Sequence, residues 1–437
     1  MNTATEQRQL DYACLAEQQT LQLHLLKQHL HYLEQYSPYY RNLFGKIGFN
    51  SADFSNLAQL AELPFTTKSE LGAHNPDFLA VDPAEVVDIC ETSGTTGEPV
   101  TLWQNEHDLQ RLAYNECVSF RAAGLKATDR ILVGAALDRV FIAGLAYFLG
   151  LRRLGATVIR AGSGQPALVA ELIRRQRPNV LIGVPSLLLT LARQYRERGD
   201  DPAALGIEKV ICIGEPVRKQ TLELSPLGEA LQQQWGAQIL GTYASTEMAT
   251  AFTDCTSACG GHVVPELVYV EIVDAEGNAV PHGCVGEVVA TPLQNQATPL
   301  LRYRTGDMAS MHIEPCLCGR LTPRLGPIVG RRAQMLKCRG TTLFPAAIDN
   351  ALAGIEGVMG HYVEVRNDYD LCDRVRVVVG CRDSTLSAEF IAGRIGACTR
   401  VKPEVVLVSP LEIQRMILRP EKRKPVTFFD YRSDTTI

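Results

Sequence analysis

Between residues 130 and 245, short apolar runs alternate with longer segments whose apolar residues have helical spacing. The runs are RILVGAAL (130–137), ATVIRAG (156–162), NVLIGVP (179–185), KVICIGEP (209–216) and QILGTYAS (238–245). The expected helices lie between them, near 143–154, 166–176, 186–198 and 218–234. This alternation predicts an α/β domain built on a mostly parallel sheet. Because ligands bind beyond the carboxyl ends of such strands, the loops GVPS, GEPV and YASTE are candidate binding loops.

The flanking regions follow other patterns. Leucines at helical spacing over residues 16–35 predict an N-terminal helix. The runs 267–274 and 284–293, with the turn sequence AEGN between them, predict antiparallel strands. Beyond Gly330, a helix near 346–353 and strands at 361–366 and 374–380 predict an α+β unit. We therefore expect a large N-terminal domain over 1–330, with mostly parallel sheets flanked by helices plus a small β-region, and a small α+β C-terminal domain over 331–437.

Composition narrows the class of protein. Of the 437 residues, 46% are apolar and 21% are charged, as in ordinary folded domains. The chain has 43 Lys and Arg residues and 48 Asp and Glu residues, so its formal net charge is −5. This charge lacks the excess of basic residues that is typical of nucleic-acid-binding proteins. The sequence shows neither an apolar run long enough for a membrane span nor the pattern of a secretory signal. The 13 cysteines are an odd number spread thinly, which favours reduced thiols in a cytoplasmic protein.

The segment ETSGTTGEPV (91–100) gathers small hydroxyl residues and glycines. Glycines let the backbone approach a ligand closely, and hydroxyls with exposed amide groups can cradle phosphate oxygens. The spacing is not that of a Walker A loop. Taken alone, the segment is either a polar surface turn or a phosphate-binding loop made by Ser93, Gly94, Thr95, Thr96 and Gly97.

Further motifs follow this loop in a fixed order. They are GEP (214–216), YASTE (243–247), YRTGD (303–307), GRRAQMLKCRG (330–340) and the closing segment KPVTFFDYR (424–432). Together with SGTTGEP they resemble the adenylate-forming superfamily of acyl- and aryl-CoA synthetases, and most of all its phenylacetate–CoA ligase-like branch. The resemblance spans roughly residues 35–432 and implies an α/β fold whose small C-terminal domain is mobile. It also implies two half-reactions, in which a carboxylate attacks the α-phosphate of ATP and a thiol then attacks the acyl-adenylate.

The resemblance implies roles for the matching residues. Glu247 would hold Mg²⁺ on the ATP phosphates. Tyr243 would stack on adenine, with Glu215 and Pro216 on the other side, and Asp307 would accept hydrogen bonds from the ribose hydroxyls. The remaining nucleotide contacts would come from the loop 93–97 and from Gly214, Ala244, Ser245, Thr246 and Arg304, for which a structural ion pair is the alternative.

Two basic residues complete the implied ATP site. Arg331 would contact the ribose or a phosphate. Lys424 would be the catalytic lysine, whose charge offsets the repulsion between a carboxylate and a polyphosphate. Lys422 is the alternative, because both lie in the charge run EKRKP.

The chain also departs from the family pattern. Glu98 follows the phosphate loop without the lysine that many relatives carry there. Ala333 and Gln334 replace the aspartates usual in the hinge segment, which lets the small domain rotate between the two half-reactions. These changes bear mainly on the second half-reaction.

We expect small and aromatic side chains to line the carboxylate-binding pocket, because such side chains suit a flat aryl ring. By the resemblance it involves the segment 140–150, the strand at 211–214 and the residues around 243–252, and plain core packing is the alternative for each residue. The candidates are Phe141, Ala143, Gly144, Tyr147, Met248 and Phe252.

Two short pairs of soft ligands indicate a metal site. Cys316 and Cys318 form a C-x-C in a Pro/Gly turn, and Cys255 and His262 lie seven residues apart upstream. Four such ligands suit tetrahedral Zn²⁺ in a structural role, and the branch often carries a similar set. Cys259 is a competing ligand, and unrelated reduced residues are the alternative interpretation.

We expect an ATP-dependent aryl-CoA ligase that acts on a small aromatic carboxylic acid and uses Mg²⁺, ATP and coenzyme A. The alternatives are transfer to a carrier-protein phosphopantetheine thiol, adenylation of a deazaflavin phenol, and nucleotide binding without catalysis in a regulatory protein. We expect a monomer or a homodimer with neither a nucleic-acid nor a membrane partner.

Overall fold

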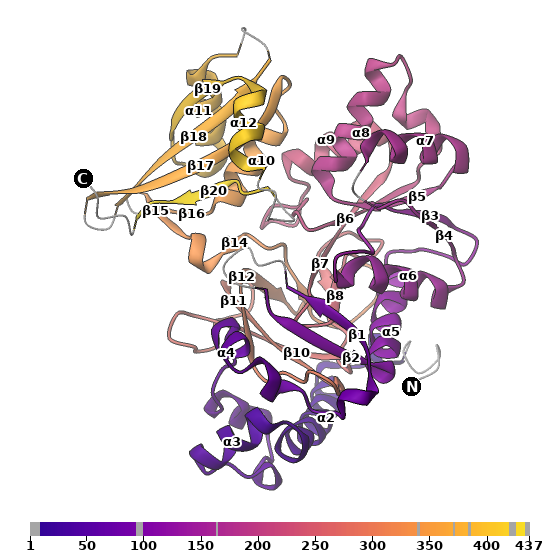
Figure 1. The fold of residues 1–437 in the computed structure, drawn as a ribbon, viewed down its shortest axis with the longest axis vertical. Helices are drawn as coiled ribbons and strands as arrows, with labels where there is room; N and C mark the ends of the chain where they lie inside the picture. Colours follow the sequence, from indigo (N-terminus) through magenta and orange to yellow (C-terminus); the bar gives the residue numbers. More distant parts are fainter. Residues whose placement is uncertain are drawn as a thin grey trace. The chain divides into compact units, whose positions relative to one another are not determined.

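A computed structural model describes residues 9–92, 99–162, 165–338, 341–369, 372–382, 386–418 and 425–432. They divide into two compact units, whose path is drawn in Figure 1. Of the described residues, the first unit takes those up to 224 and from 231 to 328. The second unit takes 225–230 and the described residues from 329 onward.

A largely parallel sheet forms the centre of the first unit. Its strand order is β4-β3-β5-β6-β7-β8, and only the β7–β8 pair is antiparallel. The predicted parallel sheet is therefore confirmed, although most strands end before the apolar runs do. The strands are β3 (Arg130–Val133), β4 (Thr157–Arg160), β5 (Val180–Gly183), β6 (Lys209–Ile213), β7 (Gln238–Ser245) and β8 (Thr250–Thr253).

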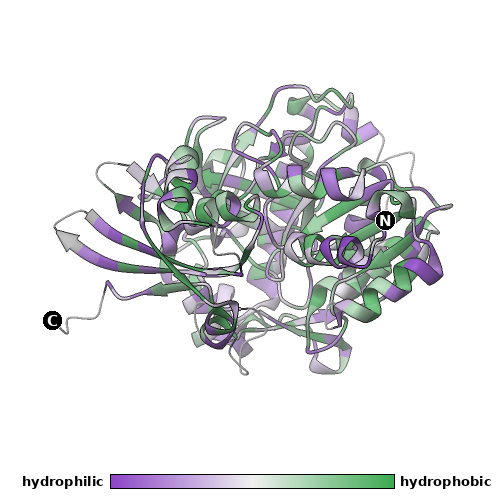
Figure 2. Ribbon diagram, turned by 90° about the horizontal axis from the view of Figure 1, so that it is seen from above, coloured by the Kyte–Doolittle hydropathy of each residue, from purple (hydrophilic) through white to green (hydrophobic). Residues whose placement is uncertain are grey.

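Helices cover both faces of this sheet. Phe120 of α5 and Tyr147 of α6 share one apolar cluster with Ile131 and Ile211 of the strands, whereas Figure 1 shows α7 and α8 on the opposite face. Figure 2 shows hydrophobic colouring concentrated on strands in the interior, as burial of this core requires. The helices are α5 (Glu106–Ala122), α6 (Ile142–Leu154), α7 (Pro166–Gln176), α8 (Pro185–Glu197) and α9 (Pro226–Trp235).

The helix expected near 218–234 begins only at Pro226. The residues before it form a turn closed by a bridge between Arg218 and Leu224. The guanidinium of Arg218 is buried and donates to the Asp254 carboxylate at 2.7 Å and to the carbonyl of Ile239 at 2.9 Å. The start at Pro226 has a local cause, because a proline suits the first helical position and the Ser225 hydroxyl accepts a hydrogen bond from the N–H of Gly228 at 3.3 Å.

The remaining elements of the first unit precede and follow this sheet. The predicted antiparallel strands are confirmed, because β10 pairs with β11 and β11 with β12, followed by β13 and β9. The helices are α2 (Leu15–Tyr36), α3 (Pro38–Ile47) and α4 (Lys68–Ala73), with 3₁₀ turns at Ser51–Asp53, Leu57–Glu62, Asn75–Phe78, Pro83–Glu85 and Pro202–Leu205. The strands are the hairpin β1 (Val86–Glu91) and β2 (Thr101–Asn105), and β9 (Gly261–His262), β10 (Val268–Val273), β11 (Val285–Pro292), β12 (Tyr303–His312) and β13 (Arg324–Leu325).

The second unit contains a four-stranded sheet of order β19-β18-β17-β20. Alternate valines such as Val363 and Val377 point into a core shared with α10 and α11. Its helices are α10 (Pro345–Ala353), α11 (Ala388–Thr399) and α12 (Pro410–Ile417), with a 3₁₀ turn at Arg332–Gln334. Its strands are β14 (Gly330–Arg331), β15 (Leu336–Cys338), β16 (Thr341–Leu343), β17 (Val358–Tyr369), β18 (Cys372–Cys381), β19 (Glu404–Val408) and β20 (Phe428–Asp430).

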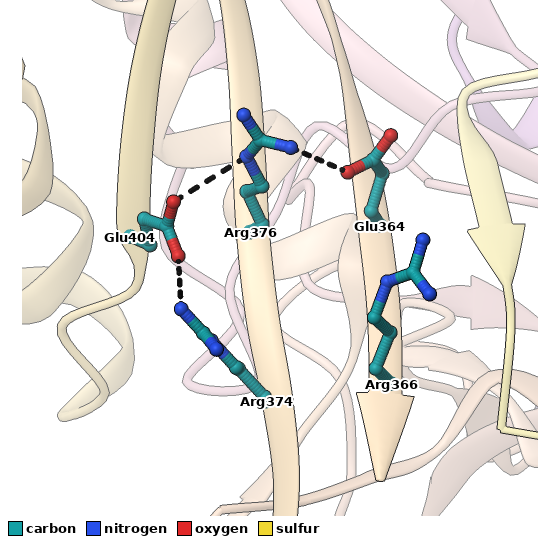
Figure 3. A pocket seen from close by; sticks show the side chains of 5 residues that line it. All are labelled: Glu364, Arg366, Arg374, Arg376 and Glu404. Atoms are coloured by element: carbon teal, nitrogen blue, oxygen red, sulfur yellow. Dashed lines mark hydrogen bonds and ion pairs between the residues drawn. The ribbon is translucent and has the colours of Figure 1, made fainter. Parts of the chain in front are cut away.

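The other face of this sheet carries a ladder of ion pairs around a shallow hollow, shown in Figure 3. Arg376 bridges Glu364 and Glu404 at 3.3 and 3.4 Å, and Arg374 also reaches Glu404 at 2.9 Å. Both arginines are largely exposed. Exposed pairs contribute only about 0–1 kcal/mol each, so the ladder is a solvated face that adds little to stability.

A buried arginine of α5 links the parallel sheet of the first unit to the antiparallel strands β10 and β11. Arg111 of α5 is 3% exposed and donates to the carbonyls of Leu293 and Ala249, both at 2.7 Å. It also donates to the hydroxyl of Thr250 and to the carbonyl of Leu267. Burial lowers its pKa to about 10, so it stays charged at neutral pH. One helix thereby fixes the segments that flank β8, β10 and β11.

Arg111→Met should therefore destabilise the first unit by about 3 kcal/mol or more, because the acceptors lose a charged donor. Both tryptophans, Trp103 and Trp235, lie in that unit. Urea unfolding followed by tryptophan fluorescence would measure the change. Arg175→Met, which breaks an exposed pair with Glu171 in the same unit, should change the free energy by less than about 1 kcal/mol. Equal effects of the two variants would refute the assignment.

Candidate functional site

The loops after β5, β6 and β7 stand together at the carboxyl edge of the parallel sheet. Gly214, directly after β6, has a φ of 76°, which favours glycine and turns the chain sharply. The next residue, Glu215, accepts hydrogen bonds from the backbone N–H and the hydroxyl of Ser186 at 2.9 and 2.8 Å. Its carboxylate is thus fixed to the loop that follows β5. Pro216 lies in the same loop, half-buried.

Tyr243 of β7 reaches a motif far along the chain. Its hydroxyl donates to the Asp307 carboxylate at 2.9 Å. Burial, together with the charge of Asp307, raises the pKa of this phenol well above its usual value, so it remains a neutral donor. The structure therefore brings together the two residues predicted to contact adenine and ribose. Ala244 and Ser245 complete β7, and Thr246 begins the turn that follows.

Glu247 lies in the turn between β7 and β8 and contacts a residue that sequence reasoning missed. The hydroxyl of Tyr303 donates to its Oε1 at 3.0 Å. Tyr303 belongs to the YRTGD motif, in which the sequence predicts roles only for Arg304 and Asp307. The motif was the available signal, but nothing in it indicates which tyrosine faces which carboxylate.

Arg304 pairs with Glu287, with 3.0 Å between Nε and Oε2. Its guanidinium also lies 4.5 Å from the ring centre of Phe65. The structure thus places Arg304 in the ion pair that was the alternative to a nucleotide contact. Arg304 thus links β12, the strand that also carries Asp307, to Glu287 of β11.

Several predicted nucleotide contacts fall outside the described residues. These are Ser93, Gly94, Thr95, Thr96, Gly97 and Lys424, together with Glu98 and Lys422. Arg331 lies in β14 of the second unit, half-buried. Ala333 and Gln334 follow it in the 3₁₀ turn Arg332–Gln334.

The predicted carboxylate-pocket residues divide between two apolar clusters. Ala143 and Tyr147 pack against the parallel sheet, whereas Met248 and Phe252 pack with β10 and β11. Gly144 is in close contact with the backbone, since a Cβ there would lie 2.1 Å from the carbonyl oxygen of Ala136. Phe141 is half-buried at the start of α6. Core packing thus accounts for at least part of this set.

A buried glutamate that sequence reasoning missed lies beside Tyr147. Glu116 of α5 is 2% exposed, and its Oε2 has no hydrogen-bond partner among the described residues. Gly150 of α6 packs directly on it, since a Cβ there would lie 2.2 Å from the Cβ of Glu116. Burial raises the pKa of Glu116 to about 8, and its charge also helps to raise the pKa of Tyr147. A lone glutamate on a helix has no sequence signal for such an environment.

Glu116 makes the stability of the first unit pH-dependent. The pKa of its carboxyl is about 4.5 in the unfolded chain, as for an ordinary glutamate, and burial raises it to about 8 in the folded one. The unfolded state binds fewer protons in between, so the free energy of unfolding should fall as pH rises from about 4.5 to 8. Glu116→Gln should flatten this fall and be more stable than the parent at pH 8. Glu171→Gln, at an exposed position, is the control, and parallel urea-unfolding curves for all three proteins would contradict the assignment.

The four predicted metal ligands are brought together in the first unit. One ligand atom from each of Cys255, His262, Cys316 and Cys318 lies within 4.8 Å of the others. Cys255 Sγ is 3.6 Å from Cys316 Sγ, and Cys318 Sγ is 3.4 Å from His262 Nε2. The competing ligand Cys259 lies outside this group, although its Sγ is 3.3 Å from that of Cys316.

The surroundings of the cluster fit a zinc ion. His262 Nδ1 is 2.8 Å from the Thr322 hydroxyl, which fixes the ring with Nε2 toward the sulfurs. Burial lowers the pKa of His262 to about 4, so the imidazole is neutral, as metal binding requires. Arg320 donates to Cys318 Sγ at 3.4 Å and pairs with Asp11 at 2.9 Å. Three thiols and a neutral imidazole suit tetrahedral Zn²⁺ without an open position.

Metal analysis of purified protein should find about one zinc ion per chain. Cys316→Ser should lose the metal and lower the thermal midpoint, because it removes the sulfur nearest to two others. Cys284→Ser, at an exposed cysteine outside the cluster, should keep both. Cys259→Ser tests the competing ligand, because it should keep the metal if the other four residues hold it. Full zinc content in Cys316→Ser would defeat the ligand assignment.

The chain is an α/β protein whose parallel sheet carries acidic and aromatic side chains at its carboxyl edge, the edge at which proteins of this class bind their ligands. The chain belongs to the AMP-binding enzyme family, whose model matches residues 46–292. This confirms the family predicted from the ordered motifs.

Relatives and solved structures agree with this assignment. The chain is 34% identical to a phenylacetate-coenzyme A ligase of Thermus thermophilus over 78% of this chain and 76% of that protein. It is 31% identical to the Escherichia coli phenylacetate-coenzyme A ligase over 89% and 88% of the two chains. A crystal structure of 2-hydroxyisobutyryl-CoA ligase in the postadenylation state has a TM-score of 0.85, with 22% identity over 98% of this chain and 94% of that one. The predicted α/β fold class is thereby confirmed.

Proposed function

We propose that the protein is an ATP-dependent aryl-CoA ligase. It activates an aromatic carboxylic acid as acyl-AMP with release of pyrophosphate, and then transfers the acyl group to the thiol of coenzyme A with release of AMP. The observation that carries the proposal is the 30–34% identity, over most of the chain, to proteins named phenylacetate-coenzyme A ligase. The proposal that the acid is aromatic rests on these relatives. The structure of 2-hydroxyisobutyryl-CoA ligase, at 22% identity, supports only the fold.

The described residues fit the first half-reaction. Asp307, held by Tyr243, would accept hydrogen bonds from the ribose, and the Tyr243 ring would lie against adenine near the loop of Glu215. Glu247 offers a carboxylate to Mg²⁺, a hard cation that prefers oxygen ligands. Bound Mg²⁺ supplies positive charge that offsets the repulsion between phosphate and the incoming carboxylate.

Residues beyond the described part of the chain complete this proposal. The loop 93–97 would bind phosphate oxygens through its amide and hydroxyl groups. Lys424 would approach the reacting carboxylate and stabilise the charge that develops at phosphorus. The acid would lie near Phe141, Ala143, Tyr147, Met248 and Phe252, whereas Gly144 packs on the carbonyl of Ala136 and leaves no space for the ring there. A domain boundary near 330 would let the small C-terminal domain, with Lys424, move between the half-reactions.

A carrier-protein thiol is the second candidate acceptor. The pair Ala333 and Gln334 in the hinge segment bears on thiol transfer to either acceptor, and together with Glu98 it motivates the alternative of nucleotide binding without catalysis. The first half-reaction is the same for either acceptor, so adenylation and thiol transfer are measured separately.

The decisive experiment is ATP–pyrophosphate exchange against phenylacetate, hydroxylated and amino-substituted benzoates, and medium-chain fatty acids. We expect one aromatic acid to stimulate exchange strongly, and coenzyme A to convert the adenylate to the thioester faster than a phosphopantetheinylated carrier protein does. Exchange only with fatty acids would contradict the aryl class. Silence with every acid, in protein that binds ATP, would favour the regulatory alternative.

The same assay tests the catalytic lysine. Lys424→Ala should lower exchange by roughly 10²- to 10³-fold, as loss of one charge-stabilising group does in other active sites. Thiol transfer from a supplied acyl-adenylate should survive. Lys422→Ala is the matched control from the same charge run, and an effect on Lys422 alone would move the role there.

A further inference from the structure

Tyr303 is the first residue of the YRTGD motif and of β12, and it contacts the turn that carries Glu247. Its side chain is 2% exposed, and its hydroxyl donates to Glu247 Oε1 across 56 residues of chain at 3.0 Å. Glu247 itself is only half-buried. A buried donor thus holds one oxygen of a half-buried carboxylate.

The backbone of Tyr303 is fixed from both sides. On one side it is paired with Ala290 of β11. On the other it bridges Thr66, which bonds the two flanking residues: Thr66 N–H donates to the Arg302 carbonyl at 3.1 Å, and Arg304 N–H donates to the Thr66 carbonyl at 2.9 Å.

A buried hydroxyl network locks this segment further. The Thr66 hydroxyl donates to the Leu301 carbonyl at 2.7 Å, and the Tyr40 hydroxyl is 2.7 Å from that of Thr66. The N–H of Leu301 in turn donates to the Tyr40 hydroxyl at 2.8 Å. The phenol of Tyr303 therefore projects from a segment with little freedom to move, as a positioning group must.

The electrostatic setting explains why the donor is a phenol. Glu247 shares its surroundings with a second carboxylate, since the charges of both Asp307 and Glu247 raise the pKa of Tyr243. Glu247 also helps to raise the pKa of the buried Cys90 thiol to about 12, after burial itself and Asp88. A lysine or arginine in place of Tyr303 would neutralise Glu247 and compete with a cation. A phenol orients the carboxylate and leaves its full negative charge in place.

We propose that Tyr303 is a positioning residue for the divalent cation that accompanies ATP. Its hydroxyl holds Oε1 so that the Glu247 carboxylate meets the cation in one fixed orientation. The inference rests on the proposed function, because it assumes that Glu247 receives the cation of the nucleotide complex.

Direct cation binding tests this role without relying on turnover. Mn²⁺ binding would be measured by electron paramagnetic resonance in the presence of α,β-methylene-ATP, which cannot transfer its adenylyl group because its α–β bridge is not cleaved. Tyr303→Phe should weaken Mn²⁺ binding by about 10- to 100-fold, within the range expected for loss of one hydrogen bond to a charged group. In pyrophosphate exchange it should raise the Mg²⁺ concentration needed for half-maximal rate by a similar factor and change the rate at saturating Mg²⁺ less.

Tyr114→Phe is the matched control, because the Tyr114 hydroxyl also donates to a buried carboxylate, Glu266 Oε1, at 2.9 Å. It should lower the thermal midpoint without changing Mn²⁺ binding. Unchanged Mn²⁺ binding in a folded Tyr303→Phe, or an equal loss in Tyr114→Phe, would overturn the proposal.

A second variant keeps the test open if Tyr303→Phe does not fold. Glu247→Asp keeps the charge but withdraws it from the phenol by one methylene, so it should weaken Mn²⁺ binding comparably, and equal binding to the parent would overturn the positioning role. A parent protein that binds no Mn²⁺–nucleotide and shows no exchange would instead refute the proposed function.

Discussion

The guanidinium of Arg111 is the contact on which the geometry of the first unit most depends. It satisfies carbonyl groups of Ala249, Leu267 and Leu293 from the interior of one helix. Ala249 ends the turn that contains Glu247, Thr250 begins β8, and the other two residues adjoin β10 and β11. A buried cation must be fully paired to be tolerated, so these segments cannot drift apart without leaving the charge unsatisfied. The parallel sheet and the antiparallel strands are thereby held in register around α5.

Two phenol–carboxylate contacts are built on this frame. Tyr243 holds Asp307, and Tyr303 holds Glu247. Each contact crosses between β7 or its following turn and β12, so each carboxylate is oriented by a residue from the other sheet. Neutral donors fix the direction of a charge without cancelling it. This arrangement suits a site in which a ribose and a cation-bearing polyphosphate are the groups to be recognised.

The fold was largely predictable because burial leaves a periodic record in the sequence. Apolar runs located the parallel strands, and the spacing of Cys255, His262, Cys316 and Cys318 anticipated the cluster that forms. The features that could not be predicted depend on contacts between distant residues. Arg218 binds Asp254, Tyr303 reaches a carboxylate 56 residues away, and Glu116 is buried against Gly150 of α6. A motif identifies residue types, but only the packed structure shows which of them face one another.

The metal-ligand cluster has a topological consequence. Cys255 and Cys316 are 61 residues apart, and the chain between them contains β10, β11 and β12 with both Tyr303 and Asp307. A metal ion held by the four ligands would tie the ends of this segment into a closed loop and remove about 4 kcal/mol of chain entropy from its unfolded state, by analogy with a disulfide of that loop length. The strands β10, β11 and β12 would then unfold and refold as one unit. Their stability against unfolding would depend on the affinity of the four ligands for the ion.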